Sequence, residues 1–209
     1  GVLARGGNVA DAAVAVSFAL GVAEPDASGI GGDGMALVWL ASMDAPVAVD
    51  FKDVTPGRAS LDNAAVFRDG RLVADGPAAA NVPGLVAGMD LIHRRFGSRR
   101  FSWSDLVTPA ADLAAAGIVV DEPLAATLAE GRTLLARYPA SAELWLPQGR
   151  VPVAGERLAN PDLAETLRGI AAGGAEAFYR GAIAHRIAED MAANGGLITA
   201  EDLAGYRAV

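Results

Sequence analysis

Hydrophobic and polar residues alternate along the segment VAVDF at 47–51, which predicts a β-strand. Its valines and Phe51 share one face, whereas Asp50 lies on the other face together with Lys52, the next residue after the strand. A second apolar run, MALVWL at 35–40, is separated from it by the polar turn ASMDAP. The pattern therefore predicts an antiparallel β-hairpin whose second strand ends on charged residues.

A different spacing governs the second part of the chain, where apolar residues recur at intervals of three and four. Ser, Thr, Asn and Pro at the starts of these segments, and glycines at their ends, are typical helix boundaries. We expect a loop around Pro139 and Pro147. The predicted helices lie at 83–97, 102–117, 122–138, 160–174, 175–196 and 198–206.

One further helix is predicted near the N-terminus, at 9–22, where Asn8 and Asp11 have the spacing of a capping pair. This segment is apolar almost all the way round, which is typical of a fully buried helix. Residues 57–82 show no sustained pattern and contain two short strand candidates. The hairpin is thus preceded by a helix and followed by an irregular segment.

These elements indicate a fold of the α/β (α+β) class. We expect residues 1–209 to form a single domain portion, with a sheet-forming core segment at 1–82 and an α-rich layer at 83–209. Hydrophobic residues make up 52% of the chain, enough for a substantial core. The sequence opens on Gly1 without an initiator methionine and stops at Val209 without a terminating feature, so we expect a piece of a longer protein.

Charge and composition exclude several classes of partner. The net charge of −8 disfavours nucleic acid and anionic membrane surfaces, and the one basic cluster, HRRFGSRR at 93–100, has the form of a helix end. Cysteine is absent, which excludes disulfides and thiolate metal sites. No breaker-free run of about 18 apolar residues occurs, so no membrane span is expected. The compartment stays open between periplasmic or secreted and cytoplasmic.

The glycine-rich segment SGIGGDG at 28–34 satisfies the pattern GxGxxG. A dinucleotide fingerprint needs a strand before it and a helix after it, so that a helix N-terminus meets the pyrophosphate. Here a helix precedes the glycines and a strand follows them, which excludes the nucleotide-binding interpretation. We expect these glycines to allow close approach of backbone or ligand.

The residue types used most often in catalysis form no recognisable constellation along the sequence. His93 and His185 lie on different helices without a second ligand at helical spacing, so we expect no metal or cofactor and assign both to solvent-facing positions. Ser17 and Ser28 are not in a nucleophile elbow, and the acidic residues show no obvious dyad. Composition and spacing alone therefore indicate an α/β fragment and assign no reaction to it.

Four segments, in the right order, resemble the large subunit of the gamma-glutamyltranspeptidase family. They are RGGNVADAAVAVSFALGVAEPDASGIGGDGMALVW, ANVPGLVAGMDLIHRRFG, PAADLAAAGIVV and the long C-terminal stretch from NPDLAETL to DLAGYRAV. The resemblance implies an N-terminal-nucleophile hydrolase with a four-layer αββα sandwich, made from a proenzyme that cleaves itself. It also implies that the nucleophilic threonine belongs to a small subunit, so that this chain contains no catalytic residue and is incomplete without that partner.

The same resemblance gives the end of the predicted hairpin a role. Asp50, Phe51 and Lys52 align with an Asp-Phe-Arg segment whose arginine binds the α-carboxylate of a gamma-glutamyl substrate. Lysine offers a point charge where arginine offers a planar fork, and Asp33 replaces a glycine of the family pattern. We therefore expect Lys52, held in place by Asp50 on the same face, to bind a substrate carboxylate. The alternative is a solvated strand edge.

The expected function is cleavage or transfer of a gamma-glutamyl, glutathione-like amide through an acyl-enzyme on a threonine outside this chain. One alternative is a related amidohydrolase or acylase that acts on an oxamate-type amide or an acylated amine. A second alternative is a non-catalytic helical module used in assembly, which the α-rich second part of the chain would suit.

Overall fold

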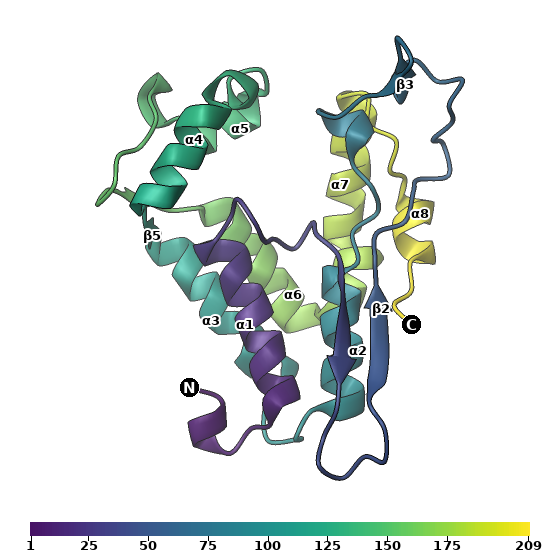
Figure 1. Cartoon of the computed structure of the whole chain (residues 1–209), viewed down its shortest axis with the longest axis vertical. Helices are drawn as coiled ribbons and strands as arrows, with labels where there is room; N and C mark the ends of the chain where they lie inside the picture. Colours follow the sequence, from purple (N-terminus) through teal and green to yellow (C-terminus); the bar gives the residue numbers. More distant parts are fainter.

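The predicted hairpin is present in the computed structural model, which describes residues 1–209. Strands β1 (Gly34–Val38) and β2 (Val47–Phe51) pair antiparallel, with Gly34 opposite Phe51 at one end and Val38 opposite Val47 at the other. The inner face of β2 is closed, because Val49 and Phe51 are only 1% and 5% exposed. Helix α2 (Leu85–Phe96) packs on this face, as Figure 1 shows.

The helices form two adjoining groups in Figure 1. Helix α3 (Trp103–Ala116) packs against α1 (Val9–Ala23) and α6 (Pro161–Tyr179), and these three lie together on one side. Helices α7 (Ala182–Ala193) and α8 (Ala200–Gly205) lie with α2 and the hairpin on the other side. Helices α4 (Glu122–Leu135) and α5 (Pro139–Trp145) extend from the first group.

A single large core of 29 buried residues joins the two groups. It includes Phe18 of α1, Phe51 of β2, Leu106 of α3, Ile170 of α6 and Leu203 of α8, all at most 5% exposed. The core thus combines residues from before and after position 83. A second, smaller cluster lies beneath α4 and contains Val120, Leu124 and Leu128.

Helix α1 is buried on one face only within residues 1–209. Val14 and Phe18 are fully buried, but Val9 and Val16 are 57% and 52% exposed. The expectation of burial on all sides, drawn from the apolar composition of the helix, is therefore not met inside this chain. An apolar side chain that remains in water does not stabilise the fold. The exposed valines therefore add to the stability of the protein only if another segment or another chain covers them.

The start of α1 is tied to the turn that follows α2. Asn8 and Asp11 form the expected capping box, with Asp11 N–H donating to Asn8 Oδ1 at 3.0 Å and Asn8 N–H donating to Asp11 Oδ2 at 3.0 Å. The Asp11 carboxylate is fully buried and also accepts a hydrogen bond from the Ser98 N–H at 3.2 Å. The sequence predicts the box, and the structure adds the long-range contact.

The helical boundaries differ from the prediction in two places. Helix α5 occupies the stretch expected to be a loop, because Pro139 stands at its first turn, where a proline is tolerated. Gly174, with φ of 67°, interrupts the helical backbone of α6 as predicted, but the segment 175–196 is not one helix, because the chain breaks again at Gly181, which precedes α7. The predicted boundary at Gly174 is therefore confirmed, and the break at Gly181 is an addition to it.

The remaining elements are short. The predicted strands in the irregular segment are confirmed as β3 (Phe67–Arg68) and β4 (Arg71–Leu72), and a further pair is formed by β5 (Ile118–Val119) and β6 (Arg157–Leu158). Three 3₁₀ helices are also present, at Leu3–Arg5, Pro77–Ala79 and Pro147–Gly149. No helix combines the length and the apolar character that a membrane crossing requires.

Candidate functional site

The end of β2 is held by contacts from three other parts of the chain. Tyr206, just after α8, donates its hydroxyl hydrogen to the carbonyl oxygen of Lys52 at 2.7 Å. Asp50 and Val209 exchange two backbone hydrogen bonds of 2.6 and 2.9 Å, so the C-terminal residue lies beside β2. Phe51 packs against α2. These contacts fix the backbone from which the Lys52 side chain extends.

Two glycines explain how α2 approaches β2 so closely. A Cβ atom on Gly84 would overlap the carbonyl of Phe51 and the hydroxyl of Tyr206, and one on Gly88 would overlap the Phe51 ring. Only glycine leaves room for the backbone and the ring at these two positions. The segment PGLVAG, at the start of α2, therefore serves to seat the strand that ends at Lys52.

The Lys52 ammonium lies among carboxylates. It forms an ion pair with Asp33 and lies 3.7 Å from Asp53 Oδ1. Asp53 in turn accepts a hydrogen bond of 2.5 Å from the Asn81 side chain. The hydrogen bond from the ammonium to Asp33 raises the pKa of Lys52 above its ordinary value. The Lys52 side chain remains 53% exposed, so the ammonium is accessible from solvent.

Asp50 takes a different part from the one we expected. It lies on the same face as Lys52, but its carboxylate accepts a hydrogen bond of 2.9 Å from the Lys52 backbone N–H and has no contact with the ammonium. The contact expected for Asp50 is made by Asp33. In the ladder Gly34 lies opposite Phe51, which brings Asp33 and Lys52, the next residue on each chain segment, to the same end of the hairpin.

The negative charge of this region affects the pKa of the Tyr206 hydroxyl. Burial of its hydroxyl, together with the nearby carboxylates of Asp50, Asp33 and Asp53, raises the pKa of Tyr206 to about 12. An anionic phenolate beside three carboxylates is disfavoured by like-charge repulsion. Tyr206 is therefore a neutral hydrogen-bond donor over the whole physiological pH range.

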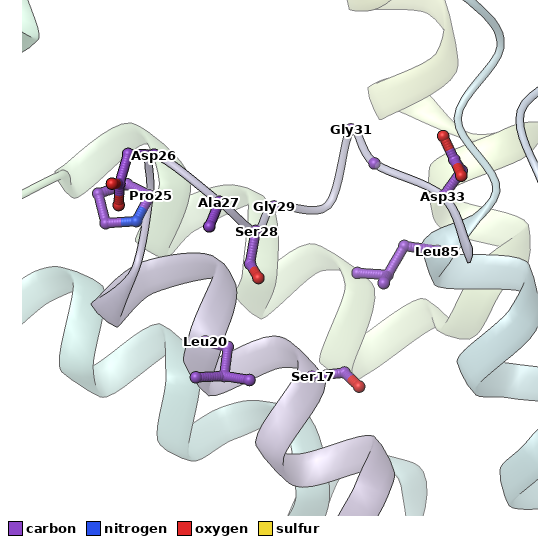
Figure 2. A pocket seen from close by; sticks show the side chains of 11 residues that line it. Ser17, Leu20, Pro25, Asp26, Ala27, Ser28, Gly29, Gly31, Asp33 and Leu85 are labelled. Atoms are coloured by element: carbon purple, nitrogen blue, oxygen red, sulfur yellow. The ribbon is translucent and has the colours of Figure 1, made fainter. Parts of the chain in front are cut away.

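A cavity of about 520 Å³ adjoins Asp33. Figure 2 shows its floor, formed by Ser17 and Leu20 of α1, and the glycine-rich loop that passes above them. Asp33 lies at the end of the cavity near Leu85, with its carboxylate turned away from the α1 side chains. The two serines considered from the sequence, Ser17 and Ser28, both line this cavity. Its lining contains no histidine or lysine that could act as a base for either hydroxyl.

The two histidines are separated from this site. His185 is exposed on α7, as expected. His93 is half-buried instead of solvent-facing, because its Nε2 lies 3.0 Å from the carbonyl oxygen of Phe101 and its ring packs near Trp103. No group of three or more histidine, aspartate or glutamate side chains is arranged to hold a metal ion.

Sequence reasoning identified Lys52 and Asp50 but missed Asp53, Asn81 and Tyr206. Tyr206 and Asn81 are distant in sequence from Lys52, and nothing in their local context distinguishes them. A further signal was present in the composition. Of the 17 lysine and arginine residues, Lys52 is the single lysine, so the one ammonium side chain of the chain is the one placed at the end of β2.

Comparisons of sequence place this chain among characterised proteins. The profile of the gamma-glutamyltranspeptidase family matches residues 1–209. The chain is 37% identical over 215 residues to the glutathione hydrolase proenzyme of Escherichia coli (strain K12), an alignment that covers 100% of this chain and 36% of that protein. It is 38% identical over 215 residues to the acylase ACY 1 proenzyme of Pseudomonas sp. (strain V22), covering 99% of this chain and 38% of that protein.

Solved structures agree with the sequence comparisons. Helicobacter pylori gamma-glutamyltranspeptidase superposes with a TM-score of 0.92 at 39% identity, covering 100% of this chain and 60% of that chain. Cephalosporin acylase from Bacillus halodurans also gives a TM-score of 0.92, at 30% identity, covering 100% of this chain and 39% of that chain.

These likenesses confirm the expected fold class, that of the N-terminal-nucleophile hydrolases, of which this chain forms a helix-rich portion. The chain spans just over a third of the length of the curated relatives it matches. Its own 209 residues nevertheless match the family profile from the first to the last. The chain belongs to the gamma-glutamyltranspeptidase family.

Proposed function

We propose that this chain belongs to the larger, N-terminal fragment of an enzyme that cleaves a gamma-glutamyl or similar amide and passes the acyl group to water or an amine. Its membership of the family supports the reaction class. The nucleophile is a threonine outside residues 1–209, exposed as a new N-terminus when the precursor cleaves itself. Its own amine takes the hydroxyl proton as the oxygen attacks the amide carbonyl, and then gives that proton to the leaving amine as the C–N bond breaks. The resulting ester is hydrolysed or aminolysed, which regenerates the threonine hydroxyl.

Within this chain, the proposed role is substrate binding. The observation that carries it is the position of Lys52, the single lysine, whose half-exposed ammonium lies at the end of β2 and contacts Asp33 beside the cavity. A substrate carboxylate that reaches this ammonium gains a charge-assisted hydrogen bond. Asp50 supports the geometry through the Lys52 backbone N–H, so that the side chain starts from a fixed point.

A small subunit from the same precursor is the proposed partner. Met35, Leu37 and Trp39 of the hairpin are 73%, 72% and 65% exposed, which leaves an apolar outer face next to the Lys52 site. Exposed apolar surface of this kind is typical of an interface. We infer that the segment 1–82 supplies sheet and the segment 83–209 a helical layer of a larger αββα sandwich, which is incomplete without that subunit.

A second candidate function is an amidase or acylase reaction on a different acyl group. Two observations favour it, namely the lysine in place of an arginine fork and the carboxylate of Asp33 on its ammonium. A curated acylase of 38% identity belongs to the same set of relatives. The two candidates share the nucleophile and differ in the acyl group that binds near Lys52.

The test uses the full-length gene product. Intact mass spectrometry should show two fragments, with residues 1–209 inside the larger N-terminal one, and the processed protein should release p-nitroaniline from gamma-glutamyl-p-nitroanilide. Replacement of the threonine at the new N-terminus by alanine should abolish both cleavage of the precursor and turnover. An active preparation that remains a single uncleaved species, or a processed protein that cleaves no gamma-glutamyl, glutaryl or other acyl anilide, would refute the proposal.

A further inference from the structure

We propose that Asp33 is a specificity-determining residue that occupies the Lys52 ammonium and thereby weakens the preference of the site for acyl groups that carry a carboxylate. The inference rests on the proposed function, because it concerns the acyl group that binds near Lys52. It adds a residue that directly precedes the other strand of the hairpin, beside the strand end to which the family resemblance points.

The pairing of β1 with β2 holds the charged side chains of Asp33 and Lys52 close together. Asp33 directly precedes β1 and Lys52 directly follows β2, and the ladder between them begins with Gly34 opposite Phe51. Side chains that are directly opposite across an antiparallel pair are close enough to interact. The Asp33 carboxylate is therefore always present near the ammonium, at a high effective concentration, and an incoming carboxylate must displace it or share the cation with it.

Asp33 has no other bonding role in the structure. Its carboxylate makes one polar contact, with the Lys52 ammonium. By contrast, Asp50 accepts from the Lys52 backbone and Asp53 accepts from Asn81. A carboxylate that caps a helix or satisfies a buried donor would be kept for stability. Asp33 does neither, so its effect is on the charge that a ligand meets.

The balance of charge at the end of the hairpin points the same way. The carboxylates of Asp33 and Asp53 lie beside the ammonium, Asp50 accepts from the Lys52 backbone, and all three carboxylates raise the pKa of the nearby Tyr206 hydroxyl. Like charges near a binding site disfavour an anionic ligand. Removing the Asp33 charge frees the ammonium and reduces this repulsion. The wild-type site should therefore prefer neutral acyl groups over anionic ones more strongly than the same site without Asp33 does.

The size of the effect follows from the exposure of the pair. The side chains of Lys52 and Asp33 are 53% and 26% exposed, and ion pairs in contact with water contribute little and are screened by salt. We therefore expect a change of about 3- to 10-fold in substrate preference, not the hundreds expected for a fully buried pair.

The experiment compares two anilides that differ only in the carboxylate, glutaryl-p-nitroanilide and butyryl-p-nitroanilide, with the processed full-length enzyme. The measured quantity is the ratio of their kcat/KM values. Asp33→Asn keeps the shape and removes the charge, so it should raise the glutaryl-to-butyryl ratio by about 3- to 10-fold at low ionic strength, and by less in high salt. Asp75→Asn is the matched control, since Asp75 pairs with Arg137 at 2.8 Å in a different part of the chain.

A double-mutant cycle separates action through Lys52 from a general effect. In a Lys52→Ala background, Asp33→Asn should change the ratio much less than in the wild type, since the ammonium that Asp33 occupies is gone. A second readout needs no turnover. Because Asp33 raises the pKa of Lys52, Asp33→Asn should increase the rate at which acetic anhydride labels Lys52 at neutral pH, measured by peptide mass spectrometry.

The outcomes separate this inference from the proposed function. If the wild type cleaves amides but Asp33→Asn leaves the ratio unchanged or lowers it, the role of Asp33 is refuted and the proposed function stands. If Asp33→Asn shifts the ratio equally with and without Lys52, Asp33 does not act through the ammonium and the inference is again refuted. If the processed wild type cleaves no amide at all, the proposed function falls and this inference falls with it.

Discussion

The hydroxyl of Tyr206 donates a hydrogen bond to the carbonyl oxygen of Lys52 at 2.7 Å, joining residues that are 154 positions apart. The same Tyr206 ring stacks on Tyr179, whose hydroxyl donates to the carbonyl oxygen of Pro83 at 2.8 Å. The two tyrosines thus connect the end of β2, the start of α2 and the C-terminal helices. Tyr206 contacts only the backbone of Lys52, but by holding that backbone it can position the Lys52 side chain.

Tyr206→Phe should separate this positioning role from a general effect on stability. Loss of the hydrogen bond should lower the free energy of unfolding by about 0.5–1.5 kcal/mol. It should also raise KM for a carboxylate-bearing substrate with little change in kcat, since the Lys52 carbonyl is no longer held. Chemical denaturation and steady-state kinetics of the processed enzyme measure the two effects.

Tyr179→Phe provides the control for Tyr206→Phe. It removes a hydrogen bond from the same tyrosine pair without touching Lys52, so it should lower stability and leave KM nearly unchanged. Equal changes of KM in both variants would contradict a specific role for Tyr206.

Lys52→Ala should lower kcat/KM for the best carboxylate-bearing substrate by about 10- to 100-fold, mainly through KM, because a charge-assisted hydrogen bond to the substrate is lost. Self-cleavage of the precursor should continue. Lys52→Arg should keep activity, and its bidentate fork should favour gamma-glutamyl substrates. Arg94→Ala, which removes an exposed cation paired with Asp90, is the control. Turnover by Lys52→Ala at the wild-type level would mean that this end of the hairpin is a solvated edge.

Asp11→Asn should destabilise the protein by about 1–3 kcal/mol at neutral pH, because a buried carboxylate that accepts several backbone hydrogen bonds is replaced by an amide. Hydrogen bonds from Ser98 and Asn8 lower the pKa of Asp11 despite the opposing effect of its burial. A lowered folded-state pKa stabilises the fold above the unfolded pKa of about 3.9, and that stability is lost as the pH falls through the folded value.

The acid dependence therefore distinguishes the Asp11 variant from the wild type. Between neutral pH and pH 3, the difference in unfolding free energy between wild type and Asp11→Asn should shrink, as measured by urea denaturation at several pH values. Asp112→Asn, a substitution in an exposed part of α3, should leave the pH profile unchanged. A difference between Asp11→Asn and wild type that stays constant down to pH 2 would contradict the assignment.

Residues 1–209 expressed alone should aggregate or remain poorly ordered, because Met35, Leu37 and Trp39 present an apolar face to water. Leu37→Glu should make this fragment more soluble in size-exclusion chromatography with light scattering, and should impair maturation of the full-length precursor. Leu61→Glu, in the irregular segment, is the control for both measurements. A wild-type fragment that is monomeric and unfolds cooperatively would contradict the proposed interface.

Local sequence signals predicted the parts of this fold that depend on neighbours in the chain. The capping box of α1 and the alternation of β2 are of this kind, and both are present. The signal failed at Pro139, around which a loop is predicted, because proline also begins helices. It also failed at Gly181, which divides the segment predicted as one helix at 175–196.

The site was predicted only in part for a related reason. Lys52 follows a recognisable strand, but its pairing with Asp33 depends on the register of the hairpin, which the six-residue turn between the predicted strands does not fix. The contribution of Tyr206 depends on the return of the C-terminal segment to β2. Tertiary relationships of this kind leave no trace in local periodicity, and the family resemblance pointed only to Lys52, so these contacts came from the structure.

The return of the chain to β2 has a consequence during synthesis. At roughly 5–20 residues per second, a ribosome needs roughly 8 to 30 s to extend the chain from Lys52 to Tyr206, 154 positions later. Until then the side of β2 that will pair with Val209 is an open strand edge, a template for association with other nascent chains. The strand that carries Lys52 is thus made well before the segment that pairs with it, so chaperone binding at this edge during synthesis should affect the yield of folded protein.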